Sequence, residues 1–191
     1  MKIKVSFFFL VMVASLLLSH SYISLAAFAA ATLHELGHII AARICDVPLK
    51  EMKLGIFGAA ITPDSNLCSY KKEIFLALSG PLINMISVLL CWRSVDSANS
   101  FVSMFVVSSL FLGTLNLLPI DDFDGGRILK CCLLLKLPPD KVTKICDGIS
   151  FLLIFFLWIF SVYLLLRLSA SLSLFTFSIS LFCKTFISRK I

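Results

Sequence analysis

The chain has 191 residues, of which 59% are hydrophobic and only 15% are charged. Soluble domains carry about 45–50% apolar and about 25% charged residues, so this composition excludes an ordinary soluble globular protein. The net charge of +6 comes from Lys and Arg that lie between long apolar runs, which indicates topology signals and not nucleic-acid binding. We therefore expect an all-α polytopic membrane protein that contacts the lipid bilayer and binds no nucleic acid.

Two membrane spans are predicted in the first part of the chain. An apolar run from Val5 to about Leu18 predicts the first, and the run from about Tyr22 to Ala42 predicts the second. The second has close to the ~20 residues that a bilayer requires. The first run could instead be a signal peptide cleaved at Ala27-Phe28-Ala29. We favour an uncleaved span, because cleavage there would leave the next apolar segment too short to cross a membrane.

The second predicted span contains an H-E-x-x-H pattern formed by His34, Glu35 and His38. Residues four apart lie on one face of a helix, so the two histidines could hold one zinc ion and Glu35 could reach a water bound to it. Such a short pattern also occurs by chance in soluble proteins. Ionisable side chains inside an apolar span are costly, however, which favours a functional site.

A polar connection over residues 43–73 follows, and it contains a short apolar stretch, Met52 to Thr62, that is interrupted by glycines and closed by Pro63. This stretch is too short to span a bilayer. Its composition predicts a β-hairpin or a re-entrant loop after the second span.

The third and fourth spans are predicted at about Ile74 to Trp92 and Phe101 to Leu118. The third contains Ser79-Gly80-Pro81, whose small residues are typical of close helix packing. It also contains Asn84, a polar side chain that needs a hydrogen-bond partner in apolar surroundings.

Three aspartates follow the fourth span, after Pro119 ends its helix. A catalytic zinc commonly takes three protein ligands and a water, so the histidine pair leaves one ligand to be found. Asp121, Asp122 and Asp124 are the candidates, and an ordinary acidic turn is the alternative.

The last two spans are predicted at about Ile149 to Leu166 and Ser169 to Phe186, as one hairpin or as a bent helix. With six spans, every Lys and Arg except Arg93 and Arg167 falls on the side of the two termini. By the positive-inside rule that side is the cytosol, so both termini and the candidate metal site are expected toward the cytosolic face.

The pattern from about residue 30 to residue 130 resembles the site-2 protease family of intramembrane zinc metalloproteases. The resemblance rests on His34-Glu35-x-x-His38, on Asn116-x-x-Pro119-x-x-x-x-Asp124-Gly125, on Gly55-Ile56-Phe57-Gly58 and on Ser79-Gly80-Pro81-x-x-Asn84. The nearest likeness is to the bacterial stage IV sporulation protein FB subgroup, which has six spans. Residues 1–191 would then form a single membrane-embedded metalloprotease domain with no separate soluble domain.

The resemblance implies a Zn²⁺ site made by His34, His38 and Asp124, with Glu35 as the catalytic base. Asp121 and Asp122 stay open as alternative ligands. It also implies that the strand around Gly55, Phe57 and Gly58 presents an edge to an extended substrate, by β-augmentation. Asn84 and Asn116 are further candidates for contacts with the substrate or with the oxyanion.

The predicted function is regulated intramembrane proteolysis by a hydrolase of the bacterial cytoplasmic membrane. Its substrate would be a membrane-associated protein, for which the resemblance suggests a sporulation transcription-factor precursor, and an inhibitory membrane partner is a further expectation. Two other functions fit the same residues. The chain could be an inactive relative that binds membrane helices without cutting them, or a metal-ion transporter, although Glu35 has no role in transport and no inverted repeat is visible.

Overall fold

The structure is a computed structural model, which describes residues 2–5, 21–47, 49–55, 58–63, 69–95, 100–168 and 173–187. The predicted first span falls almost wholly outside these ranges. The chain divides into two compact units, Met1–Leu117 and Leu118–Ile191.

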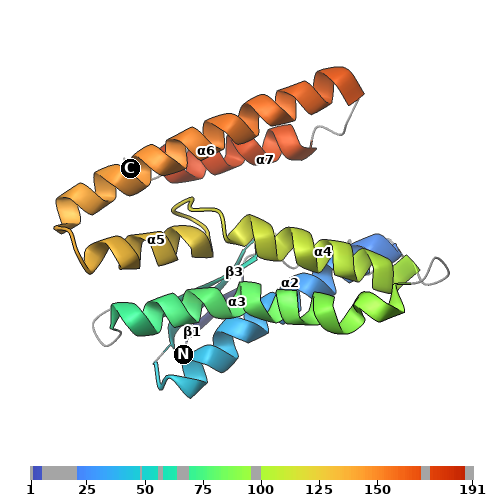
Figure 1. The fold of residues 1–191 in the computed structure, drawn as a ribbon, viewed down its shortest axis with the longest axis horizontal. Helices are drawn as coiled ribbons and strands as arrows, with labels where there is room; N and C mark the ends of the chain where they lie inside the picture. Colours follow the sequence, from blue (N-terminus) through green and yellow to red (C-terminus); the bar gives the residue numbers. More distant parts are fainter. Residues whose placement is uncertain are drawn as a thin grey trace. The chain divides into compact units, whose positions relative to one another are not determined.

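In its described residues, the first unit contains three long helices and a small sheet. The helices are α2 (Tyr22–Ile44), α3 (Tyr70–Cys91) and α4 (Ser100–Asn116), and a short 3-10 helix, η1 (Trp92–Ser94), follows α3. Each of the three long helices packs against the other two (Figure 1). Ser69 begins α3 as its N-cap, with its side chain accepting a hydrogen bond from the Lys72 backbone N–H.

Small residues allow α2 and α3 to approach closely. The face of α2 turned toward its neighbours is formed by Ala26, Ala30, His34, Gly37, His38, Ala41 and Ala42. At Gly37 an added Cβ would lie 2.8 Å from the Ser79 carbonyl oxygen of α3. Leu36 and Ile40 are exposed on another face of α2. A buried face of small and polar residues with an apolar outer face is what a helix packed in lipid requires.

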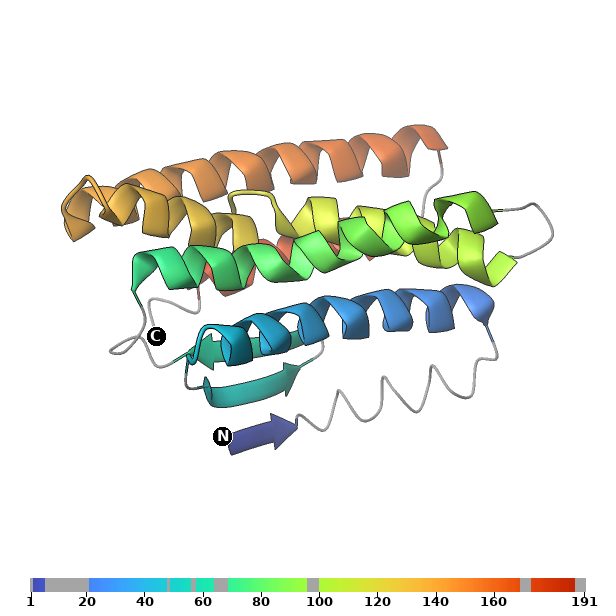
Figure 2. The ribbon, with the colours of Figure 1, turned by 60° about the horizontal axis from the view of Figure 1, so that its bottom comes forward.

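The sheet of the first unit has the strand order β1 (Lys2–Val5), β2 (Leu49–Gly55), β3 (Gly58–Pro63). β1 is parallel to β2, whereas β2 and β3 pair antiparallel in the stretch where the sequence predicts a hairpin or a re-entrant loop. Residues 56 and 57 between β2 and β3 lie outside the described ranges. β3 contacts α2 and lies beside the C-terminal half of that helix (Figure 2).

The second unit is helical where it is described. It contains α5 (Asp124–Leu134), α6 (Pro139–Leu168), α7 (Ser173–Phe182) and a π-helical turn, η2 (Cys183–Ile187). α6 and α7 are separate helices that pack side by side, and Ser161 of α6 lies 3.4 Å from Ser178 of α7 between their hydroxyl oxygens. The core of this unit is formed by Ile120, Ile154 and Leu181.

Among the described residues, three helices are long and apolar enough to cross a membrane: Tyr22–Ile44, Tyr70–Ser94 and Pro139–Arg167. Phe101–Asn116 is a shorter apolar helix. These spans, together with the many exposed aromatic side chains of α6, indicate an integral membrane protein that is mostly helical. The total of six spans and the single domain over residues 1–191 stay predictions.

Candidate metal centre

The two histidines of the H-E-x-x-H pattern lie next to each other on α2. Their Nε2 atoms are 3.2 Å apart, and the ring planes cross at 82°. His34 is 4% exposed and His38 is 5% exposed. In a tetrahedral site with Zn–N bonds of about 2.0–2.1 Å, two nitrogen ligands are roughly 3.3 Å apart. The pair therefore has the spacing that one zinc ion requires of two imidazole ligands.

The backbone of α3 orients His38. Its Nδ1 lies 2.8 Å from the Leu76 carbonyl oxygen, which also accepts a hydrogen bond from the Ser79 hydroxyl at 2.6 Å. A carbonyl oxygen can only accept, so the proton of the neutral imidazole is on Nδ1. This tautomer places a lone pair and not a proton on Nε2 of His38, as a histidine ligand requires.

A side chain of α3 contacts the Nδ1 atom of His34, as the Leu76 carbonyl contacts the Nδ1 atom of His38. The amide nitrogen of Asn84 lies 3.2 Å from Nδ1 of His34, and Asn84 is fully buried. Both histidines are therefore held from the Nδ1 side of their rings by α3.

Gly80 lies directly against the two imidazoles. A Cβ at this position would lie 2.8 Å from Nε2 of His34 and would also collide with Nε2 of His38. The space beside both nitrogens thus exists only because residue 80 has no side chain. Together with the spacing and the tautomer of His38, this makes the residues present a good fit for a Zn²⁺ ion.

Glu35, between the two histidines, is half-buried on α2. Its position next to His34 in the chain is the one that an H-E-x-x-H metallopeptidase gives to its general base.

The three aspartates of the second unit differ in their surroundings. Asp124 begins α5 and is 8% exposed, with the Arg127 guanidinium 3.7 Å from its carboxylate. Asp122 is exposed and accepts a hydrogen bond from the Thr185 hydroxyl at 3.0 Å. The backbone N–H of Asp121 donates to the Ser150 hydroxyl. Asp124 is thus the buried carboxylate of the three.

Close packing of the turn before α5 fixes the start of that helix. A Cβ on Gly126 would collide with the carbonyl group of Ile120, which is fully buried. The Phe123 backbone N–H donates to the same carbonyl at 2.8 Å. Only glycine fits this approach, so the turn holds the first residue of α5 in a defined place.

The remaining predicted site residues have different surroundings. Asn116 ends α4 and donates from its side-chain amide to the Leu112 carbonyl at 3.1 Å. Gly55 ends β2 and Gly58 begins β3, and the two are paired in the sheet. Phe57 lies outside the described residues.

Sequence reasoning missed three contributors to the histidine pair: the Leu76 carbonyl, the Ser79 hydroxyl and Gly80. The Ser79-Gly80-Pro81 stretch predicts close helix packing and is part of the family resemblance, but neither interpretation connects it to the histidines. The sequence carries no direct signal for these contributors, because the backbone hydrogen bond that Pro81 removes is that of the Ala77 carbonyl and not that of Leu76.

Comparison with known proteins supports a protease relationship. Residues 22–99 and 93–157 match the sequence model of peptidase family M50. A zinc metalloprotease of Methanocaldococcus jannaschii is 31% identical over 129 residues, which are 64% of this chain and 38% of that protein. The site-2 protease structure from the same organism is similar in fold, with a TM-score of 0.68 at 24% identity over 94% of this chain and 86% of that one. The family match covers most of the chain and includes the histidine pair and Asp124, and the chain belongs to peptidase family M50.

Proposed function

We propose that this chain is a zinc metalloendopeptidase of the site-2 type, which hydrolyses peptide bonds of membrane-associated proteins within or beside the bilayer. The observation that carries the proposal is the pair of imidazole Nε2 atoms 3.2 Å apart on a 23-residue apolar helix. Imidazoles at membrane depth are costly and mark functional sites. Family membership supplies the reaction class.

Asp124 is proposed as the third protein ligand. His34 and His38 supply two of the three ligands that a catalytic zinc takes, and the third must bear oxygen, nitrogen or sulfur. Asp124 is the buried carboxylate of the three, and a carboxylate oxygen is one of the ligands that zinc takes. Asp122 is exposed and bound by Thr185, which makes it the weaker candidate.

Glu35 is proposed as the general base. A bound zinc ion would polarise the substrate carbonyl and lower the pKa of the attacking water toward neutrality. The Glu35 carboxylate accepts the proton of the attacking water and then donates it to the leaving amine. His34 and His38 stay neutral throughout, because an imidazole ligand must keep the Nε2 lone pair.

The substrate is proposed to bind as an extended strand along the outer edge of β3. In the strand order β1-β2-β3, the second edge of β3 pairs with no other described strand. Backbone hydrogen bonds at an edge hold an extended peptide of any sequence. A transmembrane helix must unwind to offer such a strand, so we expect substrates with Gly, Pro or Asn near the cut. Gly55, Phe57, Gly58 and Asn116 are proposed to contact this peptide.

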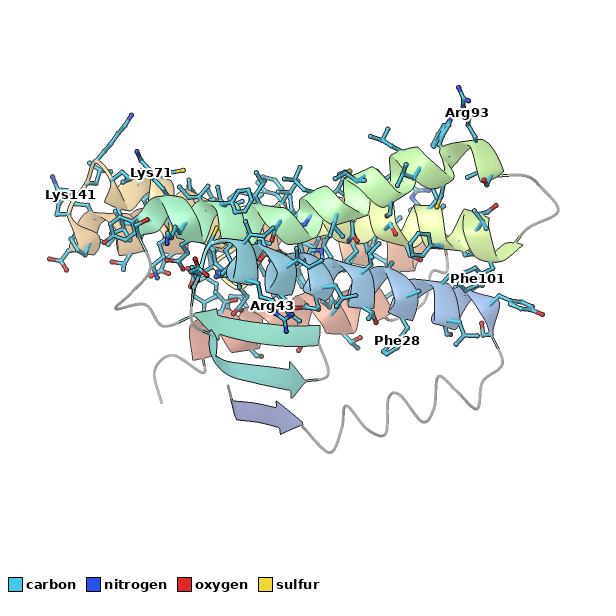
Figure 3. All side chains as sticks on the ribbon, turned by 90° about the horizontal axis from the view of Figure 1, so that it is seen from below. Phe28, Arg43, Lys71, Arg93, Phe101 and Lys141 are labelled. Carbon is cyan, nitrogen blue, oxygen red and sulfur yellow. The ribbon has the colours of Figure 1, made fainter. Side chains whose placement is uncertain are left out.

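The biological setting proposed is regulated proteolysis in a bacterial cytoplasmic membrane, with both termini and the active site toward the cytosol. In the first unit, Arg43 and Lys71 lie at one end of the helices and Arg93 lies at the other (Figure 3). A relative of the stage IV sporulation protein FB subgroup would act on a transcription-factor precursor under the control of an inhibitory membrane partner.

The test is cleavage of a model membrane substrate by purified protein, with Glu35→Gln as the matched variant. The glutamine keeps the shape of the side chain but cannot accept a proton. Zinc content should stay near one ion per chain, while cleavage should fall by about 10²–10⁴-fold. Normal cleavage by Glu35→Gln would exclude the mechanism. Zinc uptake into liposomes without cleavage by the wild type would indicate a transporter instead.

A further inference from the structure

Asn84 is a buried polar side chain whose amide makes a hydrogen bond through only one of its two polar atoms. It is 0% exposed on α3, and its Oδ1 atom has no hydrogen-bond partner among the described residues. Its other amide atom, Nδ2, lies 3.2 Å from Nδ1 of His34. Buried amide groups are rarely left half-satisfied, so this arrangement calls for an explanation.

In the orientation found, Asn84 fixes a tautomer of His34 that cannot bind a metal ion. An amide N–H can only donate, so Nδ1 of His34 must accept and the ring proton must be on Nε2. That Nε2–H can donate to Nε2 of His38, 3.2 Å away, whose own Nδ1–H donates to the Leu76 carbonyl. The result is one continuous chain of hydrogen bonds from Asn84 to Leu76, with both Nε2 atoms occupied.

A rotation of the amide by 180°, together with movement of the ring proton of His34 from Nε2 to Nδ1 by exchange with water, reverses this state. The oxygen and nitrogen of an amide have nearly the same shape and can exchange places without displacing a neighbour. Oδ1 would then accept from Nδ1–H of His34, and the Nε2 lone pairs of both histidines would become available together. In the same step the oxygen of Asn84 gains His34 as its partner and the amide nitrogen gives up that contact.

We propose that Asn84 is the positioning residue of His34: its amide turns over when the metal binds, and Oδ1 then holds the Nδ1–H tautomer that ligates. The inference rests on the proposed zinc site but not on proteolysis. It gives Asn84 a role other than contact with the substrate, because a fully buried side chain on the Nδ1 side of His34 cannot reach a peptide on the other side of the ring. His38 needs no such residue, since a backbone carbonyl performs this task.

The first experiment measures zinc affinity by chelator competition in purified, folded variants. Asn84→Leu removes the acceptor at similar volume, and it should weaken zinc binding by about 10–100-fold, as is typical for partners of histidine ligands. Asn84→Asp keeps an acceptor and should bind zinc as tightly as the wild type or more tightly.

Ser87→Ala is the matched control for this experiment. Its hydroxyl is also buried on α3 and donates to the Asn84 backbone carbonyl, so it tests the loss of a neighbouring polar group that does not touch the histidines. It should bind zinc like the wild type. Two outcomes would overturn the inference. One is equal zinc affinity of Asn84→Leu and Ser87→Ala, and the other is equally weak zinc binding by Asn84→Leu and Asn84→Asp.

The second experiment needs no variant that could fail to fold. The chain has three histidines, so ¹⁵N-imidazole spectra of the wild type can assign each ring, with His20 as an internal reference. With both rings neutral, His34 should carry its proton on Nε2 without zinc and on Nδ1 with zinc, whereas His38 keeps Nδ1–H in both states. An Nδ1–H tautomer of His34 before zinc is added would overturn the proposal. Failure of the wild type to bind zinc would overturn the metal site itself.

Discussion

Gly80→Ala is the sharpest perturbation that the structure offers, because it adds a single methyl group against both imidazoles. The new Cβ would lie 2.8 Å from Nε2 of His34 and closer still to Nε2 of His38. Neither ring can move away freely, since α3 holds each of them from its Nδ1 side. The methyl group would therefore intrude on the space beside both nitrogens that an ion must enter.

The expected magnitude follows from the cost of overpacking. Inserting one methylene-sized group into a packed site costs about 1–3 kcal/mol, which corresponds to roughly a 5- to 150-fold change in an equilibrium constant. We expect a loss of zinc affinity in or above this range, and a matching loss of cleavage. Thermal unfolding without zinc should shift less than unfolding with zinc, because the damage is centred on the ligands.

Gly148→Ala provides the control for Gly80→Ala. A Cβ at Gly148 of α6 would meet nothing within 4 Å, so the same chemical change should leave zinc binding unaltered. It should raise stability slightly, by up to about 1 kcal/mol, because alanine is the better helix former. Wild-type zinc affinity in Gly80→Ala would refute the assignment of this space to the metal ion.

Three further predictions concern the ligands, the alternatives to them and the topology. Asp124→Ala should lose zinc and cleavage together, measured as metal content and cleavage of a membrane substrate; tight zinc in this variant would mean that another residue is the third ligand. Asp122→Ala should keep zinc, because its carboxylate is exposed and bound by Thr185. A thiol reagent that cannot cross the membrane, added outside intact cells, should label a cysteine introduced by Ser94→Cys. It should not label the exposed Cys132 until the membrane is opened. The reverse pattern of labelling would mean that the topology is inverted.

The local part of the site could be predicted from the sequence, because it depends on the period of one helix. Spacing by four residues places His34 and His38 on one face, and the structure has their Nε2 atoms at the distance of two ligands. The apolar composition likewise predicted membrane spans at about Tyr22 to Ala42 and Ile74 to Trp92, and the structure has long apolar helices there, over Tyr22–Ile44 and Tyr70–Ser94. Both patterns depend only on residues that are close together in the sequence.

The contacts between helices could not be predicted in this way. The sequence showed that Asn84 requires a polar partner, but the identity of that partner depends on which turn of α3 lies opposite His34. Nothing in the linear pattern fixes this register. It is set by the close approach of α2 and α3 at Gly37 and Gly80, which is visible only when both helices are in place.

The same contacts explain how α2 can carry two imidazoles through an apolar environment. A polar side chain in lipid is tolerated when its hydrogen-bonding groups are satisfied by neighbouring helices. On α2 both Nδ1 atoms have their partners on α3, and the two Nε2 atoms lie against each other. The outer face of α2, where Leu36 and Ile40 are exposed, is apolar and needs no hydrogen-bond partners in lipid. α3 therefore has two tasks that are inseparable: it removes the cost of burying the histidines, and by the same hydrogen bonds it decides which ring nitrogens are available to a metal ion.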